Sequence, residues 1–190
     1  MSLPTLESFS WKDETVLLRV DFNVPLDEQG SVADDTRIRA ALPTINYLLE
    51  QESKVIICSH LGRPKGKAEP SMSLLPAARH LQGLLDREIL FSEHGAAAEA
   101  TKERLPPGGV MVLENLRFYP GEKSDDRSFA QNIAKLGSAY VNDAFGVLHR
   151  KHASVSALPS FLDKRAVGHL VRHEHDALGR LLQEDAKPFV

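Results

Sequence analysis

The carboxyl end of the first predicted strand carries two short polar side chains that could bind a ligand together. Asp21 and Asn23 flank Phe22 directly after an apolar run at residues 16–20. In extended backbone, residues two apart point to the same side, and parallel α/β sheets bind ligands beyond the carboxyl ends of their strands. A carboxylate repels anions, so this pair suits a ligand hydroxyl.

Basic side chains stand at or near the ends of later predicted elements, which would meet at the same edge of a parallel sheet. They are Arg37, His60, Arg63, Arg117 and Arg150. Guanidinium groups bind phosphate or carboxylate through two parallel hydrogen bonds and keep their charge. Together with the polar pair, these residues predict one crevice for a small, doubly anionic, hydroxylated ligand.

Each of these residues also has a structural interpretation. A single arginine on a loop is usually a solvated surface charge, but four at successive element ends favour a shared site. Asp21 could instead cap a turn, and His60 could be a structural hydrogen-bonding residue. Cys58 and His60 are spaced as a nucleophile and its base could be, yet a cysteine that closes an apolar strand is more often a small core residue.

The other histidines and the absent motifs narrow the function further. His149 and His152 stay open, because either could line the crevice. His169 and His173 have the i, i+4 spacing of a metal pair, but no third ligand is evident, so a solvated helix face is favoured and no metal is expected. Neither glycine-rich nucleotide motif occurs. The sequence therefore predicts an anion site without a nucleotide site.

Strands and helices alternate along the chain. Apolar runs predict strands over residues 16–20, 54–58, 88–91, 110–113 and 139–141. Helical spacing of apolar residues predicts helices over residues 36–49, 73–84, 96–104, 124–136 and 166–182. This order predicts a three-layer α/β/α sandwich with a mainly parallel, Rossmann-like sheet of about six strands. Pro43 falls inside the first helical pattern, so that helix either begins near it or kinks there.

Composition excludes several classes of function. The 190 residues suit one domain, or one domain with an extension. A net charge of −3 gives no general attraction to nucleic acid or an anionic membrane. The single cysteine excludes an internal disulfide and fits a reducing compartment. No apolar run has the ~18 residues of a membrane span, and we expect no signal peptide. We expect a cytoplasmic protein with no nucleic-acid or membrane partner.

Five motifs carry a resemblance to a known family. They are RVDFNVP at residues 19–25, DTRI at 35–38, SHLGRP at 59–64, ENLRF at 114–118 and NDAFG at 142–146. In this order the motifs resemble those of phosphoglycerate kinases, and they match only the N-terminal domain of that family. The resemblance covers nearly the whole chain.

The resemblance implies an activity and a division into domains. Members of the family transfer a phosphoryl group between ATP and the carboxylate of 3-phosphoglycerate, in glycolysis and gluconeogenesis. Residues 1–165 would form the 3-phosphoglycerate domain, and residues 166–190 would form the interdomain helix and the start of the nucleotide domain. Mg-ATP or Mg-ADP would bind to the C-terminal domain, the partner in cis, and no cofactor would bind to this part. A monomer that binds 3-phosphoglycerate without turnover is expected.

The resemblance also implies roles for the residues at the predicted crevice. Asp21 and Asn23 would bind the glycerate hydroxyl, and Arg37 would be the catalytic residue near the carboxylate and the transferred phosphoryl group. The 3-phosphate would be held by His60, Arg63, Arg117 and Arg150. Two other hypotheses stay open. The chain could be a stand-alone binding module for a small phosphorylated hydroxy acid, or a structural or interaction protein whose arginines are solvated surface residues.

Overall fold

Six strands form one sheet in the order β3-β4-β2-β1-β5-β6, and all neighbouring strands are parallel. The computed structural model describes residues 4–181. The strands are β1 Thr15–Arg19, β2 Lys54–Cys58, β3 Ile89–Ser92, β4 Val110–Leu113, β5 Ala139–Asn142 and β6 Lys164–Val167.

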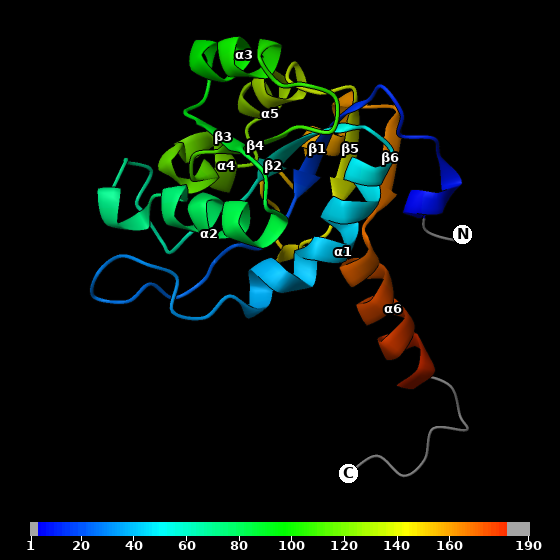
Figure 1. The fold of residues 1–190 in the computed structure, drawn as a ribbon, viewed down its shortest axis with the longest axis horizontal. Coiled ribbons are helices and arrows are strands. Elements are labelled where there is room, and N and C mark those ends of the chain that lie inside the picture. The colour runs from blue at the N-terminus through cyan, green and yellow to red at the C-terminus, as the bar shows by residue number, and fades with distance from the viewer. Residues whose placement is uncertain (1–3, 182–190) are drawn as a thin grey trace.

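Helices cover both faces of the sheet. They are α1 Thr36–Glu50, α2 Leu75–Leu85, α3 Ala96–Glu103, α4 Pro120–Lys123, α5 Arg127–Ala134 and α6 His169–Leu181. In Figure 1, α3 and α5 lie on one side of the sheet and α1 and α2 on the other, while α6 extends away from the body of the molecule. Within residues 4–181, no helix combines the length and the apolar character needed to cross a membrane.

Two hydrophobic cores lie on opposite faces of the sheet. Val16 and Leu18 of β1 belong to the core beneath α1 and α2, whereas Leu17 belongs to the core beneath α3 and α5. Strand β2 divides in the same way, with Ile57 on the first side and Ile56 on the second. Burial on both faces explains why these strands read as continuous apolar runs. The predicted three-layer sandwich is confirmed.

The predicted helix over residues 166–182 is wrong at its start. Ala166 and Val167 belong to β6, which pairs with β5 at the edge of the sheet. Helix α6 begins at His169, and Leu182 lies outside the described residues. Among the residues of β6 only Ala166 is buried. An edge strand of this kind has no continuous apolar run. Its last two residues were therefore predicted as the first residues of the helix that follows.

Two other predicted helix boundaries also change. The helix expected over residues 124–136 is shorter, because the Asp126 carboxylate caps α5 by accepting a hydrogen bond from the Phe129 N–H at 2.7 Å. Helix α1 begins at Thr36 and passes through Pro43, so the alternative of a start near Pro43 is wrong.

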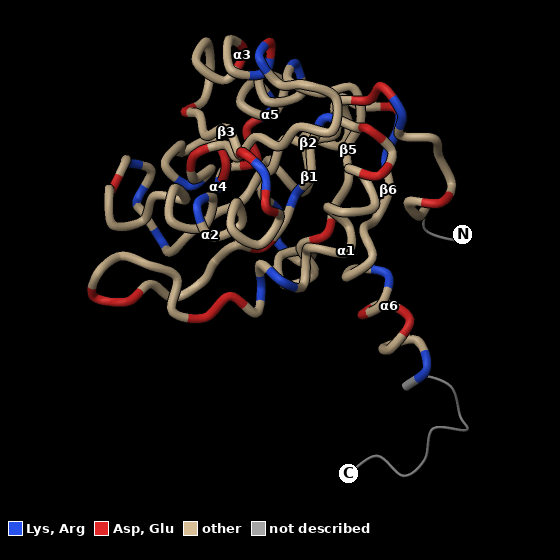
Figure 2. Tube along the Cα trace, viewed as in Figure 1, with Lys and Arg blue, Asp and Glu red and all other residues tan. Residues whose placement is uncertain are grey.

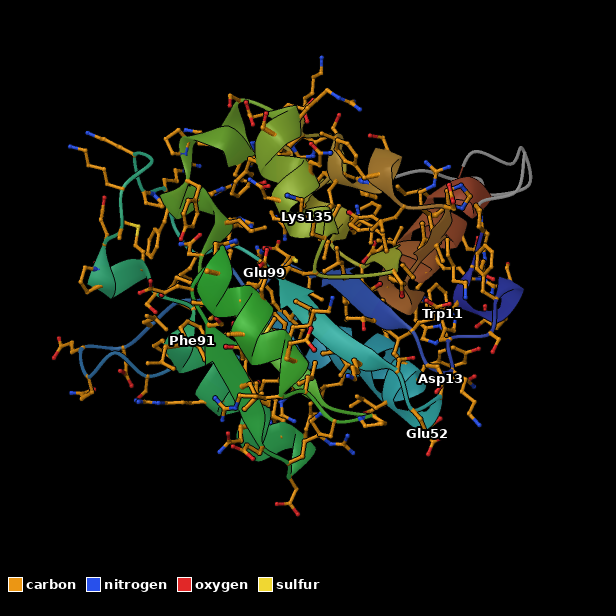
Figure 3. The ribbon with its side chains drawn as sticks, turned by 90° about the horizontal axis from the view of Figure 1, so that it is seen from above. Trp11, Asp13, Glu52, Phe91, Glu99 and Lys135 are labelled. Carbon is orange, nitrogen blue, oxygen red and sulfur yellow. The ribbon has the colours of Figure 1, made fainter. Side chains whose placement is uncertain are left out.

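Trp11 anchors the chain at the amino end of the sheet. Its indole is fully buried and donates a hydrogen bond to the Leu6 carbonyl oxygen at 2.7 Å, and its own carbonyl oxygen accepts one from Ser53 Oγ at 2.8 Å. Figure 3 shows Trp11 near Asp13 and Glu52, whose φ angles of +63° and +60° form the tight turns before β1 and β2. The longer segments that carry polar residues lie at the opposite, carboxyl end.

Candidate functional site

The carboxyl ends of three central strands lie level. Arg19, the last residue of β1, pairs with Cys58 of β2 and with Asn142 of β5. The segments that follow these strands therefore begin side by side at one edge of the sheet. Asp21 and His60 each lie two residues beyond such a strand end.

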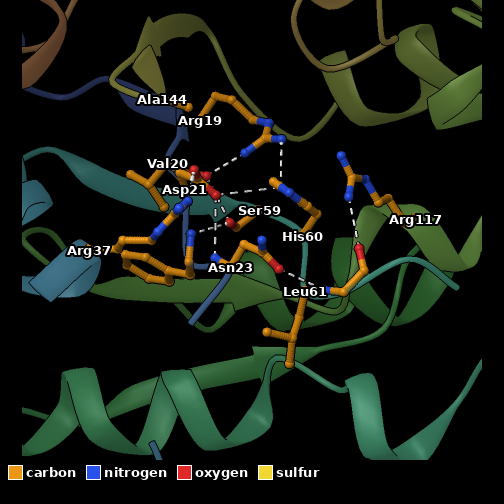
Figure 4. A network of polar contacts seen from close by, with 12 residues as sticks. Arg19, Val20, Asp21, Asn23, Arg37, Ser59, His60, Leu61, Arg117 and Ala144 are labelled. Carbon is orange, nitrogen blue, oxygen red and sulfur yellow. Dashed lines mark hydrogen bonds and ion pairs between the residues drawn. The ribbon is translucent and has the colours of Figure 1, made fainter. Parts of the chain in front are cut away.

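Asp21 and Asn23 both have protein partners at this edge. Asp21 Oδ2 accepts a hydrogen bond from Arg37 Nη1, and the two side chains form an ion pair. Asn23 Oδ1 accepts a hydrogen bond from the Gly62 N–H at 2.8 Å. Figure 4 shows Arg37 directed at Asp21 and Asn23 directed at the loop after β2. A ligand hydroxyl would join or replace these contacts.

Gly62 connects the end of β1 to the next arginine along the edge. Its N–H binds Asn23, and its carbonyl oxygen accepts a hydrogen bond from Arg117 Nη1 at 2.8 Å. The φ angle of Gly62 is +64°, and a Cβ atom there would lie 2.8 Å from Met72 Sδ. Glycine adopts this left-handed backbone more readily than residues with a side chain. The backbone of Gly62 thus provides one acceptor that orients the Arg117 guanidinium.

A pocket of about 270 Å³ lies next to these segments and has a basic lining. The lining residues are Arg63, Arg117, Lys123, Arg150 and His152. Arg117 is 5% exposed, and its Nε has no hydrogen-bond partner among the described residues. Burial, followed by the charges of Arg150 and Arg19, lowers the pKa of Arg117. A buried guanidinium with a free donor is costly unless an anion binds to it.

The basic lining is a local property of this pocket. Along the rest of the chain, positive and negative residues are interspersed, as Figure 2 shows, and the net charge is −3. Three of the four cationic lining residues are arginines, which bind phosphate in a bidentate manner. The pocket is therefore suited to a small dianion.

His60 lies between the Asp21 side chain and Arg117 in Figure 4. It is 3% exposed, and its Nδ1 lies 3.1 Å from Arg19 Nη2 and 3.9 Å from Asp21 Oδ1. Burial, and then the charge of Arg19, lowers the pKa of His60 to about 2. The imidazole is neutral at pH 7, so it offers a hydrogen bond to a ligand and no charge.

A second pocket, of about 190 Å³, lies between α1 and α6. Asp21 and Arg37 line it, together with Asp143 and Glu174. The predicted site residues are thus divided between two neighbouring pockets joined by the Gly62 hydrogen bonds. Asp21 and Arg37 lie in one, Arg63, Arg117 and Arg150 lie in the other, and Asn23 and His60 lie between them.

Asp143 ties this edge to helix α6. The side chain is fully buried directly after β5, and its Oδ1 accepts hydrogen bonds from the N–H groups of Leu170 at 2.9 Å and Val171 at 3.2 Å. Gly168 packs against the same carboxyl group, because a Cβ atom there would lie 2.3 Å from Asp143 Oδ1. Burial raises the pKa of Asp143. The carboxylate caps the amino end of α6 from another strand.

Lys123 and Arg19 were missed by the sequence analysis, and one of the two histidines that it left open lines the pocket. Lys123 lines the basic pocket, but nothing in its sequence context separates it from other exposed lysines. His152 is buried and lines the pocket, whereas His149 is exposed and is not among the lining residues. Arg19 is fully buried beside His60. A charged residue inside the apolar run at residues 16–20 was the available signal.

Cys58 lies in the core and not in either of these two pockets. Burial raises the pKa of its thiol to about 12. The thiol is protonated at neutral pH, which supports the interpretation of Cys58 as a core residue and argues against a nucleophile.

Acid is expected to destabilise the fold through His60. The pKa of this side chain is about 2 in the folded protein and 6.5 in its ordinary state. Below pH 6.5 the unfolded chain therefore binds one more proton, and stability falls as the pH drops by about 1.4 kcal/mol per pH unit for this group. Urea unfolding at a series of pH values measures the slope.

Matched histidine variants isolate this contribution. His60→Asn is expected to flatten the slope, whereas His149→Gln, at an exposed position, is expected to keep it. Burial also lowers the pKa of His94 and His152, so part of the slope remains in the first variant. A slope in His60→Asn equal to that of the parent would contradict the prediction.

Known proteins match this chain over nearly its whole length. A family model described as phosphoglycerate kinase matches residues 6–190. Proteins named phosphoglycerate kinase from Herpetosiphon aurantiacus and Desulfosudis oleivorans are 52% and 47% identical to it, over 100% and 99% of this chain. The chain covers 48% of each of these proteins, so it spans about half the length of the curated relatives it matches.

Solved structures agree with these relatives. The structure of phosphoglycerate kinase from Coxiella burnetii matches with a TM-score of 0.86, and that from Pyrococcus horikoshii OT3 with 0.88. Each is 33% identical, and each match covers 98% of this chain and 47% of the other. The family predicted from the five motifs is confirmed. The chain belongs to the phosphoglycerate kinase family.

Proposed function

We propose that this chain forms the 3-phosphoglycerate-binding half of a phosphoglycerate kinase. The observation that carries the proposal is the pocket lined by three arginines and a lysine, in which the guanidinium of one arginine, Arg117, is nearly buried and partly unpaired. A phosphate dianion satisfies that arrangement better than a neutral ligand does. Family membership supports the choice of 3-phosphoglycerate among small phosphorylated acids.

The two ends of the substrate would meet different chemistry. The 3-phosphate binds to Arg63, Arg117 and Arg150, with His60 beside them. Asp21 and Asn23 bind the hydroxyl, which is the one substrate group that a carboxylate can accept a hydrogen bond from. Arg37 exchanges its ion pair with Asp21 for the substrate carboxylate. The substrate then spans the two pockets through the polar residues between them.

The reaction needs positioning and charge neutralisation. A substrate carboxylate is ionised at neutral pH, so no general base is required. Phosphoryl transfer passes through a loose transition state that cations stabilise, and Arg37 is the residue that supplies positive charge at the carboxylate. Its half-exposed guanidinium is accessible to an incoming phosphoryl group.

Within residues 4–181, no group of three His, Cys, Asp or Glu side chains is placed to hold a metal ion. We assign Mg-ATP and Mg-ADP to a C-terminal domain, in line with relatives about twice as long. Residues 1–165 form the substrate domain in this proposal, and residues 166–190 form the connection. A cytoplasmic monomer completes the proposal.

Calorimetric titration with 3-phosphoglycerate tests the proposal directly. Saturable binding in the micromolar to millimolar range is expected for the 190-residue chain. Arg63→Ala is expected to weaken it by about tenfold, because one charged hydrogen bond to phosphate is lost. Lys65→Ala removes an exposed cation two residues away that does not line the pocket, and is expected to bind as the parent does.

Two results would contradict the proposal. Absence of saturable binding would contradict the proposed substrate site. Equal weakening of binding in Arg63→Ala and Lys65→Ala would show that the ligand is held only by unspecific charge attraction. The 190 residues alone are expected to transfer no phosphoryl group from ATP. Measurable kinase activity would contradict the assignment of the nucleotide to another domain.

A further inference from the structure

Arg19 is buried completely beneath the basic pocket, where it cannot contact solvent. Its guanidinium donates to three acceptors: Ser154 Oγ at 2.9 Å, His60 Nδ1 at 3.1 Å and the Val20 carbonyl oxygen. Figure 4 shows the guanidinium turned toward His60, on the side of the imidazole away from Leu61. Arg19 thus acts on the site through other side chains.

The contact between Arg19 and His60 assigns the proton on the imidazole. A guanidinium only donates hydrogen bonds, so His60 Nδ1 must accept and cannot carry a proton. A neutral imidazole holds its single proton on the other nitrogen, Nε2. Among residues 4–181, the hydrogen bonds of His60 involve Nδ1 and none involves Nε2, which is not one of the completely buried atoms that lack a partner. The free nitrogen of His60 is therefore a donor.

A buried carboxylate balances the charge of Arg19. Glu122 of α4 is fully buried, and its Oε1 accepts a hydrogen bond from Ser154 Oγ at 2.6 Å. The same Oγ accepts from Arg19 Nε, so Ser154 links the two charges. Glu122 Oε2 also accepts from the Ser154 N–H at 2.9 Å. Glu122, Ser154, Arg19 and His60 form one continuous chain of hydrogen bonds across four segments of the edge.

We infer that Arg19 is a positioning residue, which holds His60 in the Nε2–H form and so presents one fixed hydrogen-bond donor to the bound anion. The inference rests on the proposed function, because it explains how His60 at that site always offers a hydrogen-bond donor to the bound anion. An imidazole with its proton on Nδ1 would point a lone pair at the anion and repel it.

The surroundings keep this donor constant with pH. The groups that face His60 are Arg19 from β1, Arg117 after β4, Arg150 and His152 from the loop after β5, and Asp21 after β1. Four of them are basic and disfavour a second proton on the imidazole. The Asp21 carboxylate, at 3.9 Å, favours it but is outnumbered. His60 therefore donates in the same way across the neutral range.

The test reads the His60 ring nitrogens by ¹⁵N NMR without ligand, and then measures 3-phosphoglycerate affinity by calorimetry. Arg19→Met removes the donor, and Arg19→Met/Glu122→Gln also removes the buried carboxylate that would otherwise lose its cation. Arg19→Lys keeps a donor. Tyr140→Phe is the matched control, since the Tyr140 hydroxyl donates to the Ser154 carbonyl oxygen at 2.8 Å and makes no hydrogen bond to Arg19 or His60.

We expect the parent to carry the proton on Nε2, and the double variant to show both tautomers and about a fivefold loss of affinity, the worth of one hydrogen bond. Arg19→Lys and Tyr140→Phe are expected to keep the parental tautomer. A proton on Nδ1 in the parent overturns the inference, as does parental affinity in the double variant. Absence of binding in the parent contradicts the proposed function instead, while the ligand-free spectra still decide whether Arg19 sets the tautomer.

Discussion

Arg117→Met is expected to lower the affinity for 3-phosphoglycerate by about 100-fold, the largest loss among the pocket arginines. The guanidinium of Arg117 is nearly buried and held by the Gly62 carbonyl oxygen, and its Nε has no partner among the described residues. It is therefore preorganised to bind phosphate and loses little freedom on binding. Arg63 is exposed and must be ordered by the ligand. Calorimetry on Arg117→Met and on Arg63→Met measures the difference.

Two controls separate binding from folding in this comparison. Urea unfolding of Arg117→Met reports whether loss of the Gly62 contact destabilises the chain, and affinity is compared only where the variant is folded. Arg117→Lys keeps a charge without the planar fork, so it is expected to recover only part of the affinity. A loss in Arg117→Met no larger than that in Arg63→Met would show that burial does not preorganise this residue.

Gly168→Ala is expected to lower the free energy of unfolding by about 2–3 kcal/mol. The new methyl group would lie 2.3 Å from Asp143 Oδ1 and 2.4 Å from its Cγ. Neither side can retreat easily, because Asp143 is fixed by the N–H groups of Leu170 and Val171, and the Gly168 N–H binds the Asn142 carbonyl oxygen at 2.9 Å. The midpoint of urea unfolding measures the loss.

Gly83→Ala provides the matched glycine control. Gly83 lies inside α2, and a Cβ atom there meets no heavy atom within 4 Å. Alanine is favoured over glycine in a helix by about 1 kcal/mol, so this variant is expected to be more stable than the parent. Opposite signs in the two variants support the close packing of Gly168 on Asp143. Destabilisation of both to the same degree would contradict it.

The central strands could be predicted from sequence because each one is a short apolar segment that can be recognised without knowledge of its neighbours in the fold. Residues 54–58 form β2 as predicted, since burial on both faces produces a continuous apolar run. Strand β6 could not be found in this way, because its place at the edge buries only Ala166. The start of α5 depended on Asp126 acting as a cap, which its neighbours Ser124 and Asp125 could equally have done.

The site was predictable to the extent that its residues follow strand ends. Arg63, Arg117 and Arg150 do line one pocket, as parallel topology requires. The buried hydrogen bonds that hold His60 in place were not predictable, because the contact between Arg19 and Ser154 joins residues 135 positions apart. The neutral state of His60 also follows from burial and from neighbouring arginines, which only the folded chain brings together.

Asp143 connects the end of strand β5 to the start of helix α6. It follows β5 at the carboxyl edge of the sheet, and its carboxylate also holds the first turn of α6. Helix α6 has 13 residues and is therefore about 20 Å long. A tilt of about 10° at its base would displace its far end by about 3 Å. Asp143 and the first turn of α6 both line the pocket of about 190 Å³, so a tilt of the helix at this pocket would move residue 181 the most.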